Sequence, residues 1–349
     1  MQMLKMKNKL RFLVTALALF ITYAEVNAQH RICATVPDLG DLAHEIGGDK
    51  VEVITFVKGS EDPHFITPRP SFIKDLARAE VFIQNGLEQE VGWAPPLLQS
   101  SRNKKVQPGG SGYIDASQVI NPLEVPKGPI SRSEGDVHPG GNPHYLLSPI
   151  NGLKTARYLK THFSYLWPKD KKYFEQRYDD FASRFGKMLI GGTLAAKYQD
   201  IQLDQLMLLK HQGMLSAYLK QEGELDSLGG LLALVEPYRG TKLIDDHPMW
   251  VYFSKDFEFK VIGHLEPKPG LQPTPSHVAK VIKQVRTEGV KAVLANAYYD
   301  PRHARFVEMN TDAKVAKMSH QVGAREFAKS YLEMCEYNVR EIVRVLKND

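Results

Sequence analysis

Cysteine is scarce in this chain, with only two among 349 residues. Zinc sites built from cysteine need more thiolates than Cys33 and Cys335 can supply, so such a site is excluded. The two cysteines allow at most one disulfide, and only if their Cα atoms come within about 7 Å. We expect two buried free thiols instead.

Long apolar runs are missing beyond the N-terminal segment. There, four basic residues precede the run FLVTALALFITYA, which leads into VNAQ. The run is shorter than the roughly 20 residues of a membrane span, and the pattern is that of a secretory signal peptide. We predict a signal peptide over residues 1–28, cleaved after Ala28, and a soluble exported product. The residues before Cys33 do not match a lipoprotein signal, so we expect no lipid anchor.

A large excess of one charge sign is also absent. The whole chain has 45 basic and 40 acidic residues, and removing the four basic and one acidic residues of the leader leaves 41 against 39, a net charge of +2. Because nucleic-acid binding relies on a strong positive field, this balance argues against nucleic acid as the partner.

The pattern of the remaining chain predicts an α/β fold. Short apolar runs alternate with amphipathic stretches over residues 30–86 and again over 241–346, which is typical of parallel sheets covered by helices. Between these series, residues 100–143 are rich in Gly, Pro and Ser and predict a long loop. Two helical patterns follow, one from Pro149 and one after Pro168.

The length predicts two lobes. About 320 residues remain after the leader, more than the roughly 250 to 300 that one hydrophobic core supports. We predict an N-terminal α/β lobe over 29–166, a connecting helix over 167–190 and a C-terminal α/β lobe over 191–349. In this architecture two α/β lobes are joined by a long rigid helix, and a ligand binds in the cleft between them.

Three histidines stand where such a cleft would lie. His64 follows the apolar run VEVITFV, His144 precedes a predicted helix, and His247 comes directly after the run KLID. Ligands in open α/β sheets bind beyond the carboxyl ends of strands, and imidazoles converging from separate loops are good zinc donors. In DPH and NPH a proline fixes the backbone before the histidine. His138 lies on a glycine-flanked loop, and two interpretations stay open for it: a transient metal ligand or an ordinary exposed histidine.

The segments around these histidines resemble the zinc- and manganese-binding solute-binding proteins of ABC importers. The resemblance is carried by GSEDPHFITPRPSFIKDLARAEVFIQNGLEQE, by GNPHYLLSPINGLKTARYL and by LIDDHPMWVYFSKDFEFKVIGHLEPKPGLQPTPSHV. It implies one metal ion between two α/β lobes, with His64, His144 and His247 as ligands. It also implies a protein that is not an enzyme and that passes its ion to an inner-membrane ABC permease.

The fourth ligand departs from the family pattern, which usually supplies Asp or Glu late in the chain. His320, in AKMSHQVGA, falls near the position of that acidic residue, and Asn296, in LANAYYDPR, is the competing position. We predict His64, His144, His247 and His320 as metal ligands, with water completing a three-histidine site as the alternative. Imidazoles without carboxylates favour Zn²⁺ over manganese.

The predicted product is therefore a periplasmic zinc-binding protein, which we expect to be a monomer. A manganese-binding member of the same family is the alternative. From another class, a zinc hydrolase would use three histidines and a water, with Asp246 or Glu61 as its base. No hydrolase motif is present, since His44 in HEIGG lacks the second histidine of HExxH.

Overall fold

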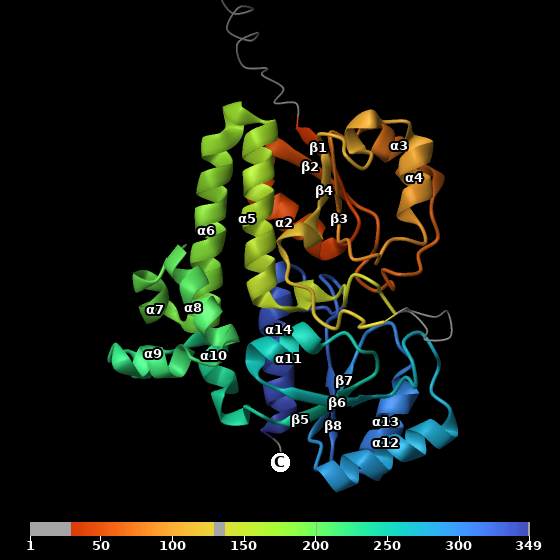
Figure 1. Ribbon diagram of the computed structural model, residues 1–349, viewed down its shortest axis with the longest axis vertical. Coiled ribbons are helices and arrows are strands. Elements are labelled where there is room, and N and C mark those ends of the chain that lie inside the picture. Colours follow the sequence, from red (N-terminus) through yellow and green to blue (C-terminus); the bar gives the residue numbers. More distant parts are fainter. Residues whose placement is uncertain (1–28, 129–136, 200, 348–349) are drawn as a thin grey trace, which may run out of the picture.

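Two parallel four-stranded sheets, one above the other, organise the molecule (Figure 1). The computed structural model describes residues 29–128, 137–199 and 201–347, so the predicted signal peptide lies outside the described residues. Within the described residues, no helix combines the length and the apolar character needed to cross a bilayer. The predicted fold class of two α/β lobes is confirmed.

The first sheet has the strand order β2-β1-β3-β4, and all its pairs are parallel. Its strands are β1 (His30–Ala34), β2 (Val51–Thr55), β3 (Val81–Gln84) and β4 (Tyr113–Asp115). Helices cover both faces, as buried parallel strands require. One face carries α2 (Pro37–Gly47), α5 (Pro149–Leu166) and α6 (Lys171–Ile190), and the other carries α3 (Pro70–Arg78) and α4 (Ala94–Ser101) (Figure 1).

The second sheet repeats this order as β6-β5-β7-β8, again wholly parallel. Its strands are β5 (Lys242–Asp245), β6 (Lys260–His264), β7 (Ala292–Ala295) and β8 (Lys314–Lys317). A small apolar cluster joins the sheet to two helices on one face, α12 (Pro275–Glu288) and α13 (Pro301–Asn310). The other face meets the larger core that also fills the first lobe, together with α11 (Val251–Phe257) and α14 (Tyr331–Leu346).

Two parts of the chain differ from the sequence prediction. Residues 100–143 are not all loop, because Ile114, which is 1% exposed, anchors the short strand β4 beside β3. Four helices without a predicted counterpart lie between α6 and β5, namely α7 (Gly192–Lys197), α8 (Ile201–His211), α9 (Leu215–Gln221) and α10 (Gly230–Val235). Strand β4, with three residues, and helices α7, α9 and α10, with six or seven each, are too short to show a clear apolar period.

The C-terminal helix α14 packs on both halves of the molecule, contacting β7 and β8 as well as α2, α5 and α6. Tyr331 at its start donates a hydrogen bond from its hydroxyl to the Leu146 carbonyl (2.7 Å), and its backbone N–H donates to Oδ2 of Asp41 (2.7 Å). Gly152 on α5 lies directly against the Tyr331 ring, where a side chain would clash. The contact between the halves is therefore closely packed.

Helix α6 buries one aromatic stripe, formed by Phe174, Tyr178, Phe181 and Phe185, against its neighbours. It packs along α2 and α5 and also contacts α7 and α10. Helix α6 lies within the segment 167–190 that the sequence assigns to a connector. The connecting role of 167–190 and the lobe boundaries 29–166 and 191–349 stay predictions.

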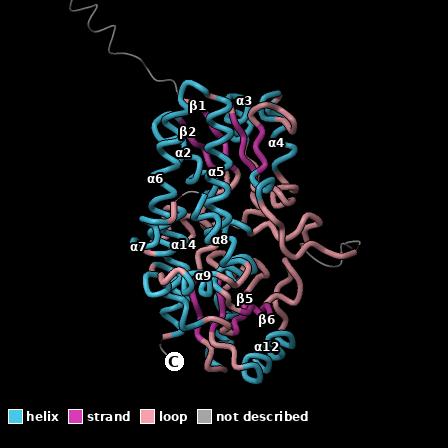
Figure 2. The backbone as a smooth tube through the Cα atoms, turned by 60° about the vertical axis from the view of Figure 1, so that its left-hand side comes forward, coloured by secondary structure: helices cyan, strands magenta, loops and turns pink. Residues whose placement is uncertain are grey.

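The strand orders locate the region where a ligand can bind. In each sheet the order in which strands are added reverses between the two central strands, which are β1 and β3 in the first sheet and β5 and β7 in the second. Ligands of open α/β sheets bind beyond the carboxyl ends of strands at such a switch point. Long loops gather between the two sheets (pink in Figure 2), and they carry the histidines.

Candidate metal centre

Three predicted ligands, His64, His144 and His247, form one cluster between the lobes. Their ring centroids lie 5.1 Å apart for His64 and His144, 5.3 Å for His144 and His247, and 6.2 Å for His64 and His247. Imidazoles on one tetrahedral zinc ion, with Zn–N bonds of about 2.0 to 2.1 Å, have ring centres about 5.2 Å apart. Two of the three separations match this value.

The third separation is about 1 Å longer than a shared ion requires. Among the described residues, no group of three or more His, Cys, Asp or Glu side chains is arranged so that it could hold a metal ion. A shorter distance between the rings of His64 and His247 would bring all three rings within reach of one ion. These two residues follow β2 in the first sheet and β5 in the second, so a small approach of the lobes shortens that distance.

The motifs DPH and NPH form the same local structure. Asp62 Oδ1 accepts hydrogen bonds from the backbone nitrogen and from Nδ1 of His64, both at 2.9 Å. Asn142 Oδ1 does the same for His144, at 3.0 and 2.9 Å. The side chain two residues before each histidine therefore fixes the ring, with Nδ1 as the protonated nitrogen. This leaves Nε2 as the metal-binding nitrogen of each ring.

His247 obtains the same orientation from a distant residue. Its Nδ1 lies 2.8 Å from Oε2 of Glu266, and the side chains of His247 and Glu266 are 6% and 2% exposed. Tyr299 stacks on the His247 ring, with centroids 5.8 Å apart. All three rings thus have Nδ1 bound to a side-chain oxygen, the arrangement that metal-binding histidines commonly show.

Asn142 also connects two of the ligand loops. Its amide nitrogen donates to the carbonyl of Pro248, next to His247, at 2.8 Å. The His144 loop is held to the end of β3 as well, since Asn85 donates to the Pro143 carbonyl at 2.9 Å. Trp93 fixes the His64 loop by donating to the Pro63 carbonyl at 3.0 Å. Much of the site is therefore preorganised before any ion binds.

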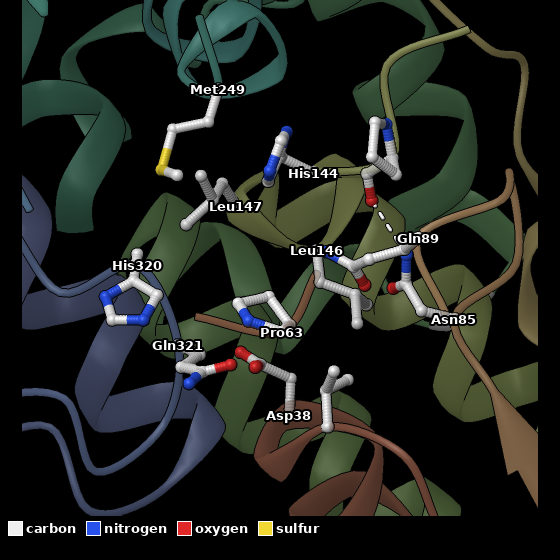
Figure 3. Close-up of a pocket in the computed structure, with 12 residues that line it drawn as sticks. Asp38, Pro63, Asn85, Gln89, His144, Leu146, Leu147, Met249, His320 and Gln321 are labelled. Atoms are coloured by element: carbon white, nitrogen blue, oxygen red, sulfur yellow. Dashed lines mark hydrogen bonds between the residues drawn. The ribbon is translucent and has the colours of Figure 1, made fainter. Parts of the chain in front are cut away.

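His320 borders the cluster on the side of His144 and has a different setting from the three rings. Its Nε2 is 3.3 Å from the Glu61 carbonyl, its Nδ1 is buried without a hydrogen-bond partner, and its ring meets Tyr298 edge-on at 4.6 Å. It lines a cavity of about 30 Å³ together with His144 (Figure 3). If it binds the ion, it does so through Nδ1.

Asn296, the competing position, is engaged elsewhere. Its backbone and side-chain nitrogens donate to Asp246 at 2.6 and 2.5 Å. Asp246 is buried and does not face solvent, and Glu61 caps the Lys58 backbone nitrogen at 2.8 Å. The two carboxylates named as bases for a hydrolase are thus both in structural hydrogen bonds.

The electrostatics keep part of the cluster neutral. Burial lowers the pKa of His144 well below its ordinary value, and the nearby His64 and His247 lower it further. Burial likewise lowers the pKa of His320 to about 4. Burial alone would raise the pKa of Asp62, but the hydrogen bond with His64 gives it a net lowering. Neutral imidazoles beside a carboxylate are ready to bind a cation without first losing a proton.

Two further histidines border the cluster. The ring of His138 lies 5.2 Å from that of His64. His264, 41% exposed, has its Nδ1 2.5 Å from the buried Asp245. Both line a pocket of about 280 Å³ with His144 and His247.

Cys33 and Cys335 are buried free thiols, as expected. Burial raises the pKa of the Cys33 thiol to about 12. Burial also raises the pKa of the Cys335 thiol. Neither belongs to the histidine cluster, which agrees with a site built without cysteine.

The chain matches one family along most of its length. The profile described as "Zinc-uptake complex component A periplasmic" (ZnuA) matches residues 32–202 and 215–345. A metal ABC transporter substrate-binding lipoprotein, ScbA of Streptococcus cristatus, is 21% identical over 97% of this chain and 99% of its own. The manganese ABC transporter substrate-binding lipoprotein PsaA of Streptococcus anginosus is 19% identical over 90% and 89%.

Solved structures share the fold. A crystal structure of ZnuA superposes with a TM-score of 0.63 at 19% identity, covering 92% of this chain and 98% of that one. A Cd-bound periplasmic metal binding protein from Candidatus Liberibacter asiaticus gives the same TM-score and identity over 91% and 100%. At these identities the likeness concerns the fold alone.

Proposed function

The chain belongs to the family of periplasmic zinc-uptake complex component A, and from this premise we propose that it captures Zn²⁺ and delivers it to an inner-membrane ABC permease. Like its relatives, it is a substrate-binding protein of a metal ABC transporter, and it is not an enzyme. The ion is its cargo. The proposed ligands are His64, His144 and His247, with His320 as the fourth.

The observation that carries the choice of zinc is the donor set of the cluster. Three imidazoles face one another, and the nearest carboxylates, Asp62 and Glu266, are hydrogen-bonded to Nδ1 of two of them. These carboxylates form a second layer behind the ligand rings, where they balance the charge of the ion without binding it. Manganese prefers oxygen donors and higher coordination numbers, whereas four nitrogen donors in a tetrahedron suit zinc.

Manganese is the second candidate because several relatives are described as manganese-binding, PsaA among them. A manganese site here would need Asp62 or Glu266 to leave its histidine and turn toward the ion. Glu266 is held from a second side as well, since the backbone nitrogen of Gly270 donates to it at 3.0 Å. Such a rearrangement costs two hydrogen bonds of a buried carboxylate, roughly 1.5 to 3 kcal/mol each.

Delivery in this proposal follows a modest closure and reopening of the cleft. The loops of His320 and His64 are already tied together, because Gln321 donates to the carbonyls of Lys58 (2.8 Å) and Glu61 (2.9 Å). The closely packed helices α5, α6 and α14 limit a wide hinge. Release to the permease therefore relies on rearrangement of the ligand loops.

We propose that the mature protein is periplasmic, monomeric and free of a lipid anchor. A lipid anchor on Cys33 would require cleavage before it, which would remove His30–Ile32 from β1 and expose a side chain that is fully buried. The streptococcal relatives are described as lipoproteins. The mass of the mature N-terminus distinguishes cleavage after Ala28 from lipidation of Cys33.

The metal is tested by analysing protein purified from the periplasm and by chelator competition with Zn²⁺ and Mn²⁺. We expect zinc in the purified protein and a much tighter complex with zinc. His64→Ala, His144→Ala and His247→Ala are each expected to weaken zinc binding by at least about 100-fold. His44→Ala, which changes an exposed histidine of α2, is the control. Full zinc affinity in the three site variants would refute the proposal.

A further inference from the structure

His247 does not have the local support that the other two clustered rings have. In DPH and NPH the side chain two residues before the histidine binds Nδ1 of that histidine. The residue two positions before His247 is Asp245, and its carboxylate instead lies 2.5 Å from Nδ1 of His264. The ring of His247 is therefore fixed by residues from other parts of the second lobe.

Tyr299 contacts both this ring and the carboxylate that holds it. Its ring stacks on that of His247, with the centroids 5.8 Å apart and the planes inclined by 24°. Its hydroxyl donates a hydrogen bond to Glu266, and Oε2 of Glu266 lies 2.8 Å from Nδ1 of His247. Tyr299 therefore acts on His247 in two ways, through the face of the ring and through Glu266.

The Glu266 carboxylate needs this donor because it is buried. Its side chain is 2% exposed, and a buried carboxylate is stable only when hydrogen-bond donors surround it. The backbone nitrogen of Gly270 supplies one hydrogen bond at 3.0 Å, and His247 and Tyr299 supply two more. Without the tyrosine hydroxyl the carboxylate is held less firmly, and so is the ring of His247.

The segment that carries Tyr299 is itself fixed at the end of β7. Asn296, the first residue after that strand, donates from its backbone and side-chain nitrogens to Asp246 at 2.6 and 2.5 Å. The ring of Tyr298 packs on that of Tyr299, with the centroids 4.5 Å apart, and meets His320 at 4.6 Å. Tyr299 is thus held in place before any ion binds.

We infer that Tyr299 is a positioning residue of the metal site, which aims Nε2 of His247 at the ion by holding both the ring face and the Glu266 carboxylate. This inference rests on the proposed function. Tyr299 and Glu266 together do for His247 what Asp62 does for His64. Because the ring of His247 then turns less freely, less conformational freedom is lost when it binds the ion.

Chelator competition with Zn²⁺ on two variants of Tyr299 tests the inference. Tyr299→Phe keeps the ring and removes the hydrogen bond to Glu266, so we expect the Kd for zinc to rise about tenfold. Tyr299→Leu removes the stacked ring as well, and Kd should rise about 100-fold. Tyr165→Phe is the matched control, because it removes a hydroxyl from a residue of α5 that is 82% exposed. Thermal unfolding of the metal-free proteins shows whether each variant folds.

A double-mutant cycle separates positioning of His247 from a general loss of structure. If Tyr299 acts through His247, adding Tyr299→Phe to His247→Ala should change Kd by less than about twofold. Nuclear magnetic resonance of the metal-free protein gives a second readout. In Tyr299→Phe the Nδ1 proton of His247 should exchange with solvent about fivefold faster, while those of His64 and His144 keep their rates.

Wild-type zinc affinity in either Tyr299 variant would overturn the inference. An equal loss of affinity with and without His247, or unchanged proton exchange at His247, would overturn it as well. If His247→Ala itself kept full zinc affinity, the proposed function would have failed instead.

Discussion

The two carboxylates behind the ligands are predicted to contribute unequally to zinc affinity. Asp62 and Glu266 each hold Nδ1 of a ligand ring, but the Asp62 side chain is 26% exposed and that of Glu266 only 2%. Glu266→Gln and Asp62→Asn keep the size and an acceptor oxygen and remove one negative charge each. The loss of affinity should follow burial, so Glu266→Gln should be the weaker binder.

The magnitude follows from the geometry. Across the imidazole, each carboxylate lies roughly 6 to 7 Å from the ion. At that distance a charge of −1 attracts Zn²⁺ by about 5 kcal/mol at an effective dielectric constant of 20 and by about 1.3 kcal/mol in water. Altered desolvation offsets part of the larger value, and replacing such a second-layer partner typically costs 10- to 100-fold in affinity. We expect about 100-fold for Glu266→Gln and about tenfold for Asp62→Asn, whose charge solvent screens.

The assay is competition with a chelator of known affinity at fixed ionic strength. Glu175→Gln serves as the matched control, because it removes the same charge from a residue of α6 whose side chain is 44% exposed and pairs with Lys171 on the same helix. Thermal unfolding of the metal-free variants shows whether each still folds. Equal affinities for both variants and the control, or a larger loss for Asp62→Asn, would refute this account of the second layer.

Three further predictions concern pH and packing. Because burial lowers the pKa of His144 and of His320 (to about 4), these rings stay neutral where ordinary imidazoles with a pKa of about 6.5 become protonated. Four ordinary imidazoles would lose zinc affinity by more than about 1,000-fold between pH 7 and 5.5. This site should lose less, and a loss of that size in chelator competition would contradict the prediction. Ser148→Ala removes the hydrogen bond to the buried Asp256 (2.5 Å) and should lower the free energy of unfolding by about 1.5 to 3 kcal/mol, and denaturant unfolding with an unchanged midpoint would disprove it. Gly152→Ala places a methyl group against Tyr331 and should cost about 1 to 3 kcal/mol, so an unchanged melting temperature would show that the contact is loose.

Much of the fold follows from the sequence because the central strands of both sheets are largely buried. Runs such as RICATV and KAVLANA are short and apolar, and they correspond to β1 and β7. The positions of His64 and His247 also follow, since each comes after such a run. β4 could not be found in this way, because only Ile114 of its three residues is fully apolar and buried.

The second layer of the site could be predicted only in part. An acidic or amide side chain two residues before a histidine is visible in DPH and NPH, and its ability to bind the histidine backbone is a general property. Glu266 is 19 residues from His247, and their proximity depends on the parallel pairing of β5 and β6, which sets Asp245 beside His264. The approach of His138 to His64 likewise depends on the folded path of a loop without periodic pattern.

The central claim is that one zinc ion lies between the lobes, bound by the Nε2 atoms of His64, His144 and His247. A crystal structure of the zinc-loaded protein with anomalous data at the zinc edge tests it most directly. We predict a single strong peak with these three nitrogens at about 2.0 to 2.1 Å and a His64–His247 ring separation shorter than the present 6.2 Å. A peak elsewhere, or three rings that remain apart with no ion among them, would contradict the account.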